Sequence, residues 1–169
     1  LKVSAGNPAV LQLAGAIEFQ EKSWLQAESY LSKALQITPD LNSARRLLIA
    51  TYLRSGQPTK ALATLQPILE KVGDDPAFLT LAGEVYMQNG EPQKAEGYFA
   101  KAARLDPKDA RKQTALAVTH LAAGGEAGFA ELQGIAASDS GVTADLTLVS
   151  AYMQRKEFDK ALKAIDGLE

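Results

Sequence analysis

The sequence predicts an all-α fold, a solenoid of stacked antiparallel helix pairs, because it repeats itself at a fixed spacing. Four residues recur after twice 34 positions, so that Gly15, Ala27, Ala34 and Pro39 match Gly83, Ala95, Ala102 and Pro107. A copy between them supplies Tyr52, Gly56 and Ala61 at an offset of 34. Turn and stop signals at constant places between amphipathic segments support the same interpretation.

These signals divide each unit into two helices. Asn7 can cap a helix that has Pro8 at its first position, where the missing N–H costs nothing, and Asp75 precedes Pro76 in the same way. Short turns separate the two helices of a unit: 21–23, 55–57 and 89–91. Pro58 and Pro92 open second helices, and Pro39 and Pro107 end them. We expect ten helices, near residues 8–21, 24–37, 42–55, 58–72, 76–89, 92–105, 109–123, 126–137, 143–155 and 158–168.

The units run near residues 8–41, 42–75, 76–109, 110–141 and 142–169, and we interpret them as one array within 1–169, cut from a longer one. The fourth unit departs from the pattern. His120 takes the Tyr position, and Tyr152 follows only 32 residues later, so two residues are missing. The small residue of the second helix is replaced by Phe129, or by Ala130 if the turn holds an insertion. Either alternative predicts a shortened or displaced second helix.

Composition excludes several classes of function. The formal charge is −2, from 18 basic and 20 acidic residues that are interspersed, so no basic stripe predicts a nucleic-acid partner. The chain has no cysteine, which removes disulfides, thiolate zinc sites and Cys nucleophiles. No apolar run is long enough for a signal peptide or a membrane span, and the sequence does not fix a compartment.

The spaced set Gly83, Tyr86, Ala95, Ala102 and Pro107, with its partial copies, resembles the tetratricopeptide repeat (TPR) family over nearly the whole chain. The resemblance implies a right-handed superhelix of about five units. It also implies that the inner wall, made by the first helices, binds a peptide or a partner protein without catalysis.

Three segments, 41–48, 65–69 and 158–166, also resemble the TPR lipoprotein that accompanies the PEP-CTERM and exosortase system of Gram-negative bacteria. That resemblance implies a periplasmic or outer-membrane-associated lipoprotein of an envelope export, sorting or exopolysaccharide system.

One face of each first helix forms the inner wall that the resemblance implies. Its candidate partner-binding residues are Gln12, Phe19, Arg46, Leu53, Arg54, Thr80, Glu84, Met87, Gln88, Arg111, Thr114, Met153 and Gln154, with Val118, Leu121, Leu146 and Ser150 on the same face. Arg46, Arg54 and Arg111 could hold a partner's carboxylates by forked hydrogen bonds. The alternative is that these are ordinary solvated residues. The Lys and Asn clamp of family members that bind chaperone tails is absent, since Gln12 with Ala16, Arg46 with Ala50, and Thr80 with Glu84 stand at the matching places.

We expect no catalytic residue, no cofactor and no metal. The single histidine, His120, stands at a packing position, and a zinc or iron site would need further ligands at suitable spacing. The paired Asp residues of the interhelical turns are best interpreted as helix caps: Asp74, Asp75, Asp106, Asp109, Asp139 and Asp145. A carbohydrate-binding module is the alternative function, disfavoured because we assign the aromatic residues Tyr52, Tyr86, Phe99 and Tyr152 to packing. Contacts between copies through the array ends are also possible.

Overall fold

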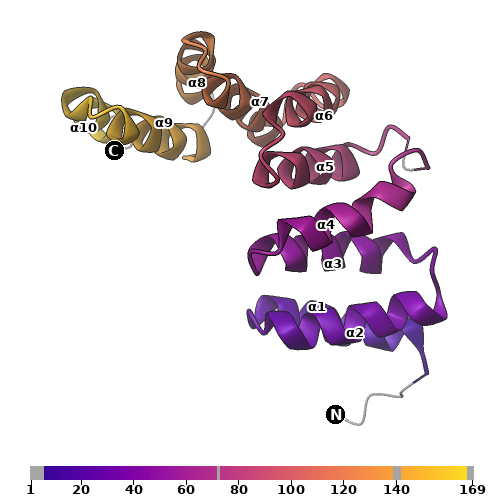
Figure 1. Ribbon diagram of the computed structural model, residues 1–169. Coiled ribbons are helices and arrows are strands. Elements are labelled where there is room, and N and C mark those ends of the chain that lie inside the picture. Colours follow the sequence, from indigo (N-terminus) through magenta and orange to yellow (C-terminus); the bar gives the residue numbers. More distant parts are fainter. Residues whose placement is uncertain (1–5, 72, 139–141, 167–169) are drawn as a thin grey trace. The chain divides into compact units, whose positions relative to one another are not determined.

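The computed structural model describes residues 6–71, 73–138 and 142–166 (Figure 1). In these residues it contains ten α-helices, one short 3₁₀ helix and no strand, which confirms the predicted all-α solenoid of helix pairs. The elements are α1 (Pro8–Gln20), α2 (Trp24–Ile37), α3 (Asn42–Arg54), α4 (Pro58–Leu65), η1 (Gln66–Ile68), α5 (Pro76–Gln88), α6 (Pro92–Leu105), α7 (Ala110–Ala122), α8 (Ala127–Ser138), α9 (Thr143–Gln154) and α10 (Phe158–Asp166).

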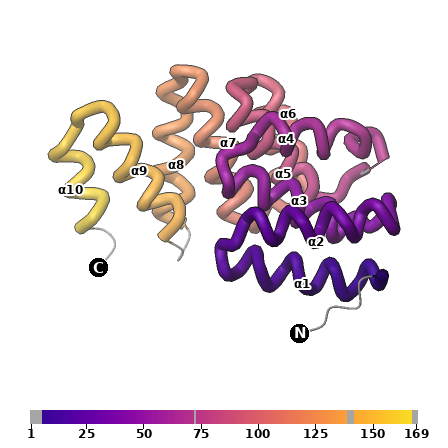
Figure 2. Tube along the Cα trace, turned by 60° about the horizontal axis from the view of Figure 1, so that its bottom comes forward, coloured from indigo at the N-terminus to yellow at the C-terminus, as the bar shows by residue number. Residues whose placement is uncertain are grey.

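The chain groups into two compact units, Leu1–Gly73 with Glu84–Gly90, and Asp74–Gly83 with Glu91–Glu169. The first contains the pairs α1/α2 and α3/α4, and the second contains α7/α8 and α9/α10. Figures 1 and 2 both show α1 beside α2 and α9 beside α10. One continuous array of five units stays a prediction.

Glycines on the first helices let the two backbones of a pair approach closely. A Cβ atom added at Gly15 would lie 2.6 Å from Cγ of Leu31, and one added at Gly83 would lie 2.6 Å from Cε1 of Phe99. Leu31 is fully buried and Phe99 is 3% exposed. The large side chain of the second helix therefore occupies the space that the glycine leaves, as the repeat predicts.

Each turn from a first to a second helix contains one residue in the left-handed region. The φ values there are positive, at Lys22 (58°), Gly56 (71°), Gly90 (77°), Gly124 (83°) and Lys156 (61°). The N–H of the next residue donates to the carbonyl five positions back at four of these turns, for example Gln57 to Tyr52 at 2.8 Å. This is the Schellman pattern, which accepts a left-handed residue to satisfy the last carbonyls of the helix.

Two of the five turns therefore carry a lysine in a conformation that suits glycine. We expect Lys22→Gly to raise the free energy of unfolding by about 1 kcal/mol, because a Cβ atom in this region is sterically strained. Thermal unfolding by circular dichroism measures the change. The matched control is Gly90→Lys, which introduces the same strain and should lower the Tm. A loss of stability in both variants would contradict the explanation.

The second helix of the second repeat, residues 42–75, is shorter than predicted. We expected it to span residues 58–72, yet α4 ends at Leu65 and gives way to η1, which contains Pro67. Proline has no N–H for the α-helical bond, and its ring clashes with the carbonyl four residues earlier. The apolar residues on both sides of Pro67 made the helical pattern look continuous in the sequence.

The fourth pair follows neither alternative that the sequence offered, since Gly128 takes the place of the small residue. Gly128 is buried, and a Cβ atom there would lie 2.7 Å from both the carbonyl oxygen of Ala117 and the amide nitrogen of Leu121. Leu132, four residues after Gly128, is fully buried. Leu31 and Leu65 are buried in the same way, four residues after the small residues Ala27 and Ala61. Phe129 and Ala130 are thus wrong for this position.

A tight first turn in α8 explains the shift. In other pairs the small residue donates to the carbonyl four positions back, as Ala27 does to Ser23 at 3.0 Å. Gly128 instead donates to Gly125, three positions back, at 3.3 Å. A 3₁₀ turn contains fewer residues than an α turn, so one of the two missing residues is accounted for here.

Candidate binding groove between α7 and α9

A groove of about 570 Å³ lies between α7 and α9, the first helices of two successive pairs in the second unit. It is lined by Val118, Leu121, Ala122, Phe129, Thr143, Leu146, Thr147, Ser150, Ala151, Gln154 and Arg155. Most of these side chains are apolar, and four contribute a hydroxyl or an amide group. This is the composition of a site that takes apolar side chains and orients them with a few polar contacts.

Phe129 reaches the groove because Gly128, and not Phe129, packs inside the α7/α8 pair. Its ring stacks on Tyr152 of α9, with 5.2 Å between ring centroids and 25° between ring planes. The hydroxyl of Tyr152 accepts a hydrogen bond of 2.7 Å from the side-chain amide of Gln133. The register shift in α8 thus creates an aromatic contact with the next pair.

Arg155 is the one charged residue among those that line the groove. Its guanidinium lies over the ring of Phe129, 4.6 Å from the centroid, and is bound by Glu126 at 2.7 Å and by Glu157 at 3.0 Å. The hydrogen bond to Glu126 is the main reason that the pKa of Arg155 is raised. Two carboxylates therefore neutralise this cation, and the groove has little net charge.

The exposed edge of the groove combines an apolar side chain with polar ones. Leu146 is 57% exposed, and Ser150 and Gln154 are exposed on the same helix. The hydroxyl of Thr147 donates to the carbonyl of Thr143 at 2.7 Å, so its lone pairs stay available as acceptors. Leu146 is the most accessible apolar contact for a partner.

The predicted partner-binding residues in the second compact unit divide into two groups. Gln154 lines the groove, as do Val118, Leu121, Leu146 and Ser150. The others do not: Thr114 is buried, Met153 is exposed outside the lining, Thr80 donates to the carbonyl of Pro76, and Arg111 is bound by Asp109. Six groove residues were not among the candidates, namely Ala122, Phe129, Thr143, Thr147, Ala151 and Arg155.

The predicted partner-binding residues in the first compact unit belong to several separate contacts. The hydroxyl of Ser43 donates to Gln12 at 2.7 Å. Phe19 is half-buried and packs edge to face on Trp24, with centroids 5.3 Å apart, and Leu53 is buried. The remaining residues are exposed or half-buried: Arg46, Arg54, Glu84, Met87 and Gln88.

Glu84 and Arg54 interact electrostatically. The pKa of Glu84 is raised because protein atoms displace water around its carboxyl group, although part of the residue stays exposed, and the charge of Arg54 partly offsets this effect. Arg54 is therefore partly committed to a neighbour within the chain. A forked bond to a partner's carboxylate would compete with Glu84.

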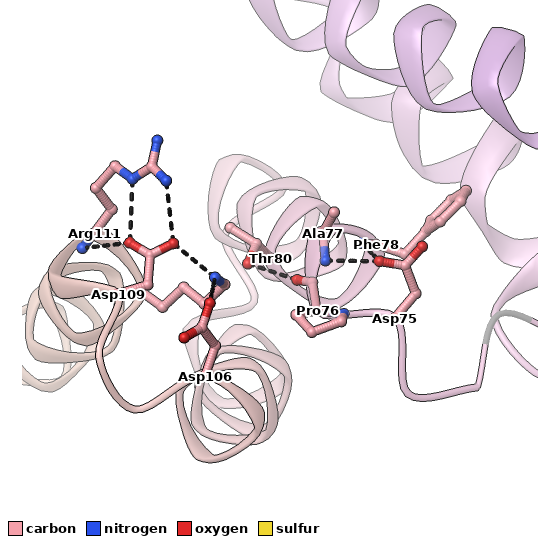
Figure 3. Close-up of polar contacts among 9 residues, drawn as sticks. Asp75, Pro76, Ala77, Phe78, Thr80, Asp106, Asp109 and Arg111 are labelled. Carbon is pink, nitrogen blue, oxygen red and sulfur yellow. Dashed lines mark hydrogen bonds and ion pairs between the residues drawn. The ribbon is translucent and has the colours of Figure 1, made fainter.

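Two of the aspartates of the turns cap helices, as predicted, whereas Asp106 accepts from the side chain of Lys112 at 2.7 Å. Asp75 accepts from the amide of Ala77 at 2.9 Å, and Asp109 accepts from the amide of Arg111 at 3.0 Å (Figure 3). Asp74 pairs with Lys101, Asp145 lies in the first turn of α9, and Asp139 lies outside the described residues.

The carboxylate of Asp109 also binds two cations. The guanidinium of Arg111 donates to both of its oxygens, at 3.1 and 3.2 Å, and Lys112 donates at 2.6 Å (Figure 3). These two cations, Arg111 first, hold the pKa of Asp109 well below its usual range. The predicted role of Arg111 in holding a partner's carboxylate would require it to leave this contact.

The pairing of Asp109 predicts an acid-dependent loss of stability. A carboxylate with a lowered folded pKa stabilises the fold above the unfolded value of about 3.9, and the effect is lost as the pH falls through the folded pKa. Asp109→Asn keeps the cap and removes the charge, so it should cost up to about 1 kcal/mol at pH 7. Urea titrations should show this difference shrinking between about pH 5 and pH 2. A constant difference would contradict the assignment, and Asp145→Asn is the control.

His120 is half-buried between two acidic side chains. Its Nδ1 lies 2.6 Å from Glu131 of α8, and its Nε2 lies 3.7 Å from Glu96 of α6. The interpretation of His120 as a packing residue omitted these polar contacts. The described part of the chain contains no group of three or more His, Cys, Asp or Glu side chains suited to a metal ion.

The aromatic residues named for packing are buried, with Tyr52 at 8%, Tyr86 at 7%, Phe99 at 3% and Tyr152 at 6% exposure. None of them presents the open ring face that a sugar platform needs. Within the described residues, no helix combines the length and the hydropathy required to cross a bilayer.

Known proteins share the repeat and the fold. The anaphase-promoting complex subunit CDC16 of Saccharomyces cerevisiae is 25% identical over 114 residues, which cover 63% of this chain and 14% of that protein. The match spans only a small part of that relative's length. The crystal structure of TTC0263, a thermophilic TPR protein of Thermus thermophilus, has a TM-score of 0.79 at 17% identity and covers 95% of this chain and 89% of that one.

A second solved structure is that of YrrB, described as a TPR protein with an unusual peptide-binding site. It has a TM-score of 0.69 at 15% identity and covers 98% of this chain and 86% of that one. Two family models described as tetratricopeptide repeat match residues 18–85 and 76–109, together more than half of the chain. The chain belongs to the tetratricopeptide repeat family.

Proposed function

We propose that this chain is a noncatalytic interaction scaffold that binds a peptide or protein segment in the groove between α7 and α9. TPR proteins act as protein-interaction scaffolds, and their fold is generally noncatalytic. The observation that carries the proposal is the groove itself, about 570 Å³ of mostly apolar lining on the first helices of two adjacent pairs. The peptide-binding site named for YrrB supports the same kind of partner.

The lining favours a segment with apolar side chains and no charge in the groove. Leu121 of α7 and Leu146 of α9 both line the groove, and Phe129 of α8 is the aromatic side chain of the lining. Arg155 is neutralised by Glu126 and Glu157, so a charged side chain would be desolvated there without a free partner. Ser150 and Gln154 can bind the segment's backbone.

The cellular setting is a separate proposal. A place in an envelope export, sorting or exopolysaccharide system, with a lipid-anchored periplasmic parent, depends on the resemblance of three short segments alone. Fractionation of cells that make the full-length parent, with detection of a lipid-modified N-terminus, would test it.

The alternative function is carbohydrate binding. A carbohydrate ligand would give heat on calorimetric titration of the chain with the polysaccharide.

The groove predicts where a partner contacts the chain. A photo-crosslinking amino acid placed at Ser150 should form an adduct with a protein or peptide, and Leu146→Asp should reduce its yield at least about tenfold, because a buried charge costs more than about 1.4 kcal/mol. The adduct is identified by mass spectrometry. Leu105→Asp on α6, also an exposed leucine, is the matched control and should leave the yield unchanged.

Two outcomes would contradict the proposal that a partner binds in the groove. Equal adducts from Ser150 and from a probe at Leu25, which is 74% exposed on α2, would indicate nonspecific contact. Retained binding in Leu146→Asp together with lost binding in the triple variant Arg46→Ala, Arg54→Ala, Arg111→Ala would move the site to the arginines of the wider wall.

A further inference from the structure

The side chain of Asn89 ties the end of α5 to the start of α4. Its amide nitrogen donates to two carbonyls, that of Val85 within α5 at 2.7 Å and that of Pro58 at 2.9 Å, with one hydrogen for each. Pro58 is the first residue of α4, and Asn89 and Pro58 both belong to the first compact unit. The bond to Pro58 therefore joins two successive repeats.

This contact is particular to the third repeat, residues 76–109. At the equivalent position 34 residues earlier, the hydroxyl of Ser55 donates to the carbonyl of Tyr52 in its own helix, at 3.2 Å. The equivalent residue 34 positions later, Ala123, has no polar group in its side chain. Because α4 is only eight residues long, a tie at its first residue restrains a large fraction of the helix.

The residue after Asn89 makes its side chain chemically reactive. The backbone nitrogen of Gly90 can attack Cγ of Asn89, because glycine has no Cβ atom to shield it. A bond forms between this nitrogen and Cγ, the bond from Cγ to the side-chain nitrogen breaks, and ammonia leaves with the hydrogen of the Gly90 N–H. Water then opens the cyclic imide at either carbonyl and gives aspartate or isoaspartate. Asn89 is half-buried and Gly90 is exposed, so water has access.

The closed contact opposes this reaction. The N–H of Gly90 donates to the carbonyl of Met87 at 3.1 Å, and the amide that must leave is held by Val85 and Pro58. The attack therefore requires a local opening in which the end of α5 separates from α4. The product has no hydrogen to donate, and its negative charge would face two carbonyl oxygens at the negative end of the α5 dipole.

We propose that Asn89 is a modification site, at which conversion to aspartate or isoaspartate releases the end of α5 from α4. The contact must open before the reaction, and the product cannot restore it, so each event is irreversible. The modified fraction of the chains then records how often this contact has opened. The reaction needs water alone, and it does not depend on the groove between α7 and α9 or on what the groove binds.

Ageing of the full chain at mildly alkaline pH tests the modification. Peptide mass spectrometry that separates the two products should find both in place of Asn89, while Asn7 and Asn42 stay intact. Asn7 precedes Pro8, which has no N–H to give up, and the exposed Asn42 precedes Ser43. Conversion of Asn89 should be at least about tenfold faster in urea, where the contact is already open. Equal rates in the folded and unfolded chain, or faster conversion of Asn42, would overturn the proposal.

Two variants test the release. Asn89→Asp is the product without ageing, and Asn89→Ala removes both bonds without adding a charge; circular dichroism confirms that each is folded. We expect Asn89→Asp to lower the Tm by roughly 4–8 °C, and Asn89→Ala to lower it by less. Hydrogen–deuterium exchange should rise in α4 and at the end of α5, both in Asn89→Asp and in the aged chain, and stay unchanged in α9 and α10. A wild-type Tm and exchange pattern in Asn89→Asp, or an equal rise in α9 and α10, would overturn the release.

Discussion

Gly128→Ala should lower the free energy of unfolding by at least about 2 kcal/mol, even though alanine favours helices over glycine by about 1 kcal/mol. The added methyl group would lie 2.7 Å from the carbonyl oxygen of Ala117 and from the amide nitrogen of Leu121. Both are backbone atoms of α7, so only a separation of the two helices can relieve the clash. Urea unfolding followed by circular dichroism measures the loss.

The same helix contains the control. Gly134 has no heavy atom within 4 Å of an added Cβ, so Gly134→Ala should stabilise the chain by about 1 kcal/mol through helix propensity alone. Two substitutions of one type in α8 are thus expected to act in opposite directions. Equal effects would show that Gly128 does not mark the close approach, and that Phe129 or Ala130 takes that position after all.

Phe129→Ala should cost about 2–3 kcal/mol and also open the groove. The ring is half-buried, stacks on Tyr152 and lies beneath the guanidinium of Arg155. Its removal takes away the packing between α8 and α9 and leaves Arg155 without its aromatic neighbour. Thermal unfolding reports the stability, and the near-ultraviolet circular dichroism of Tyr152 reports the change in its surroundings.

Conservative and distant substitutions separate these effects. Phe129→Leu keeps much of the volume and should recover most of the stability, with a remaining loss of about 0.5–1 kcal/mol from the cation–π contact. Phe158→Ala removes a ring that is 54% exposed on α10 and should change the stability of the monomer by less than about 1 kcal/mol. A loss in Phe158→Ala as large as that in Phe129→Ala would contradict the packing role assigned to Phe129.

The fold was predictable from the sequence because its signals are local and periodic. Pro8, Pro58, Pro76 and Pro92 each open the helix that was expected to begin there. The left-handed turn residues recur every 34 positions from Lys22 to Gly124. The early end of α4 was missed, since apolar residues around Pro67 favour continuation while the proline forbids it. A backbone constraint overrode the side-chain pattern there.

The candidate site was less predictable, because it depends on register in three dimensions. The inner-wall pattern named Leu121, Leu146 and Gln154, and all three line the groove; their role in binding stays a prediction. Phe129 was missed as a groove residue, since a one-residue change in the turn moves it from the inside of one pair to the surface shared with the next. The close approach of Gly128 to α7 and its hydrogen bond to Gly125 reveal that change. In the sequence, the one signal of this change was that Phe129 aligns with a position that is small in the other repeats.

The tight turn before α8 means that the hairpins of this chain are not interchangeable parts. A graft that replaced the turn between α7 and α8, residue for residue, with the α-helical turn between α3 and α4 would give Phe129 the place of the small residue, because Phe129 follows Gly124 by five positions as Ala61 follows Gly56. Phe129 would then face the backbone of α7, and Tyr152 would lose its aromatic neighbour. Design from the repeat consensus would therefore erase the groove while improving the regularity of the solenoid, so the least regular hairpin is the one to preserve.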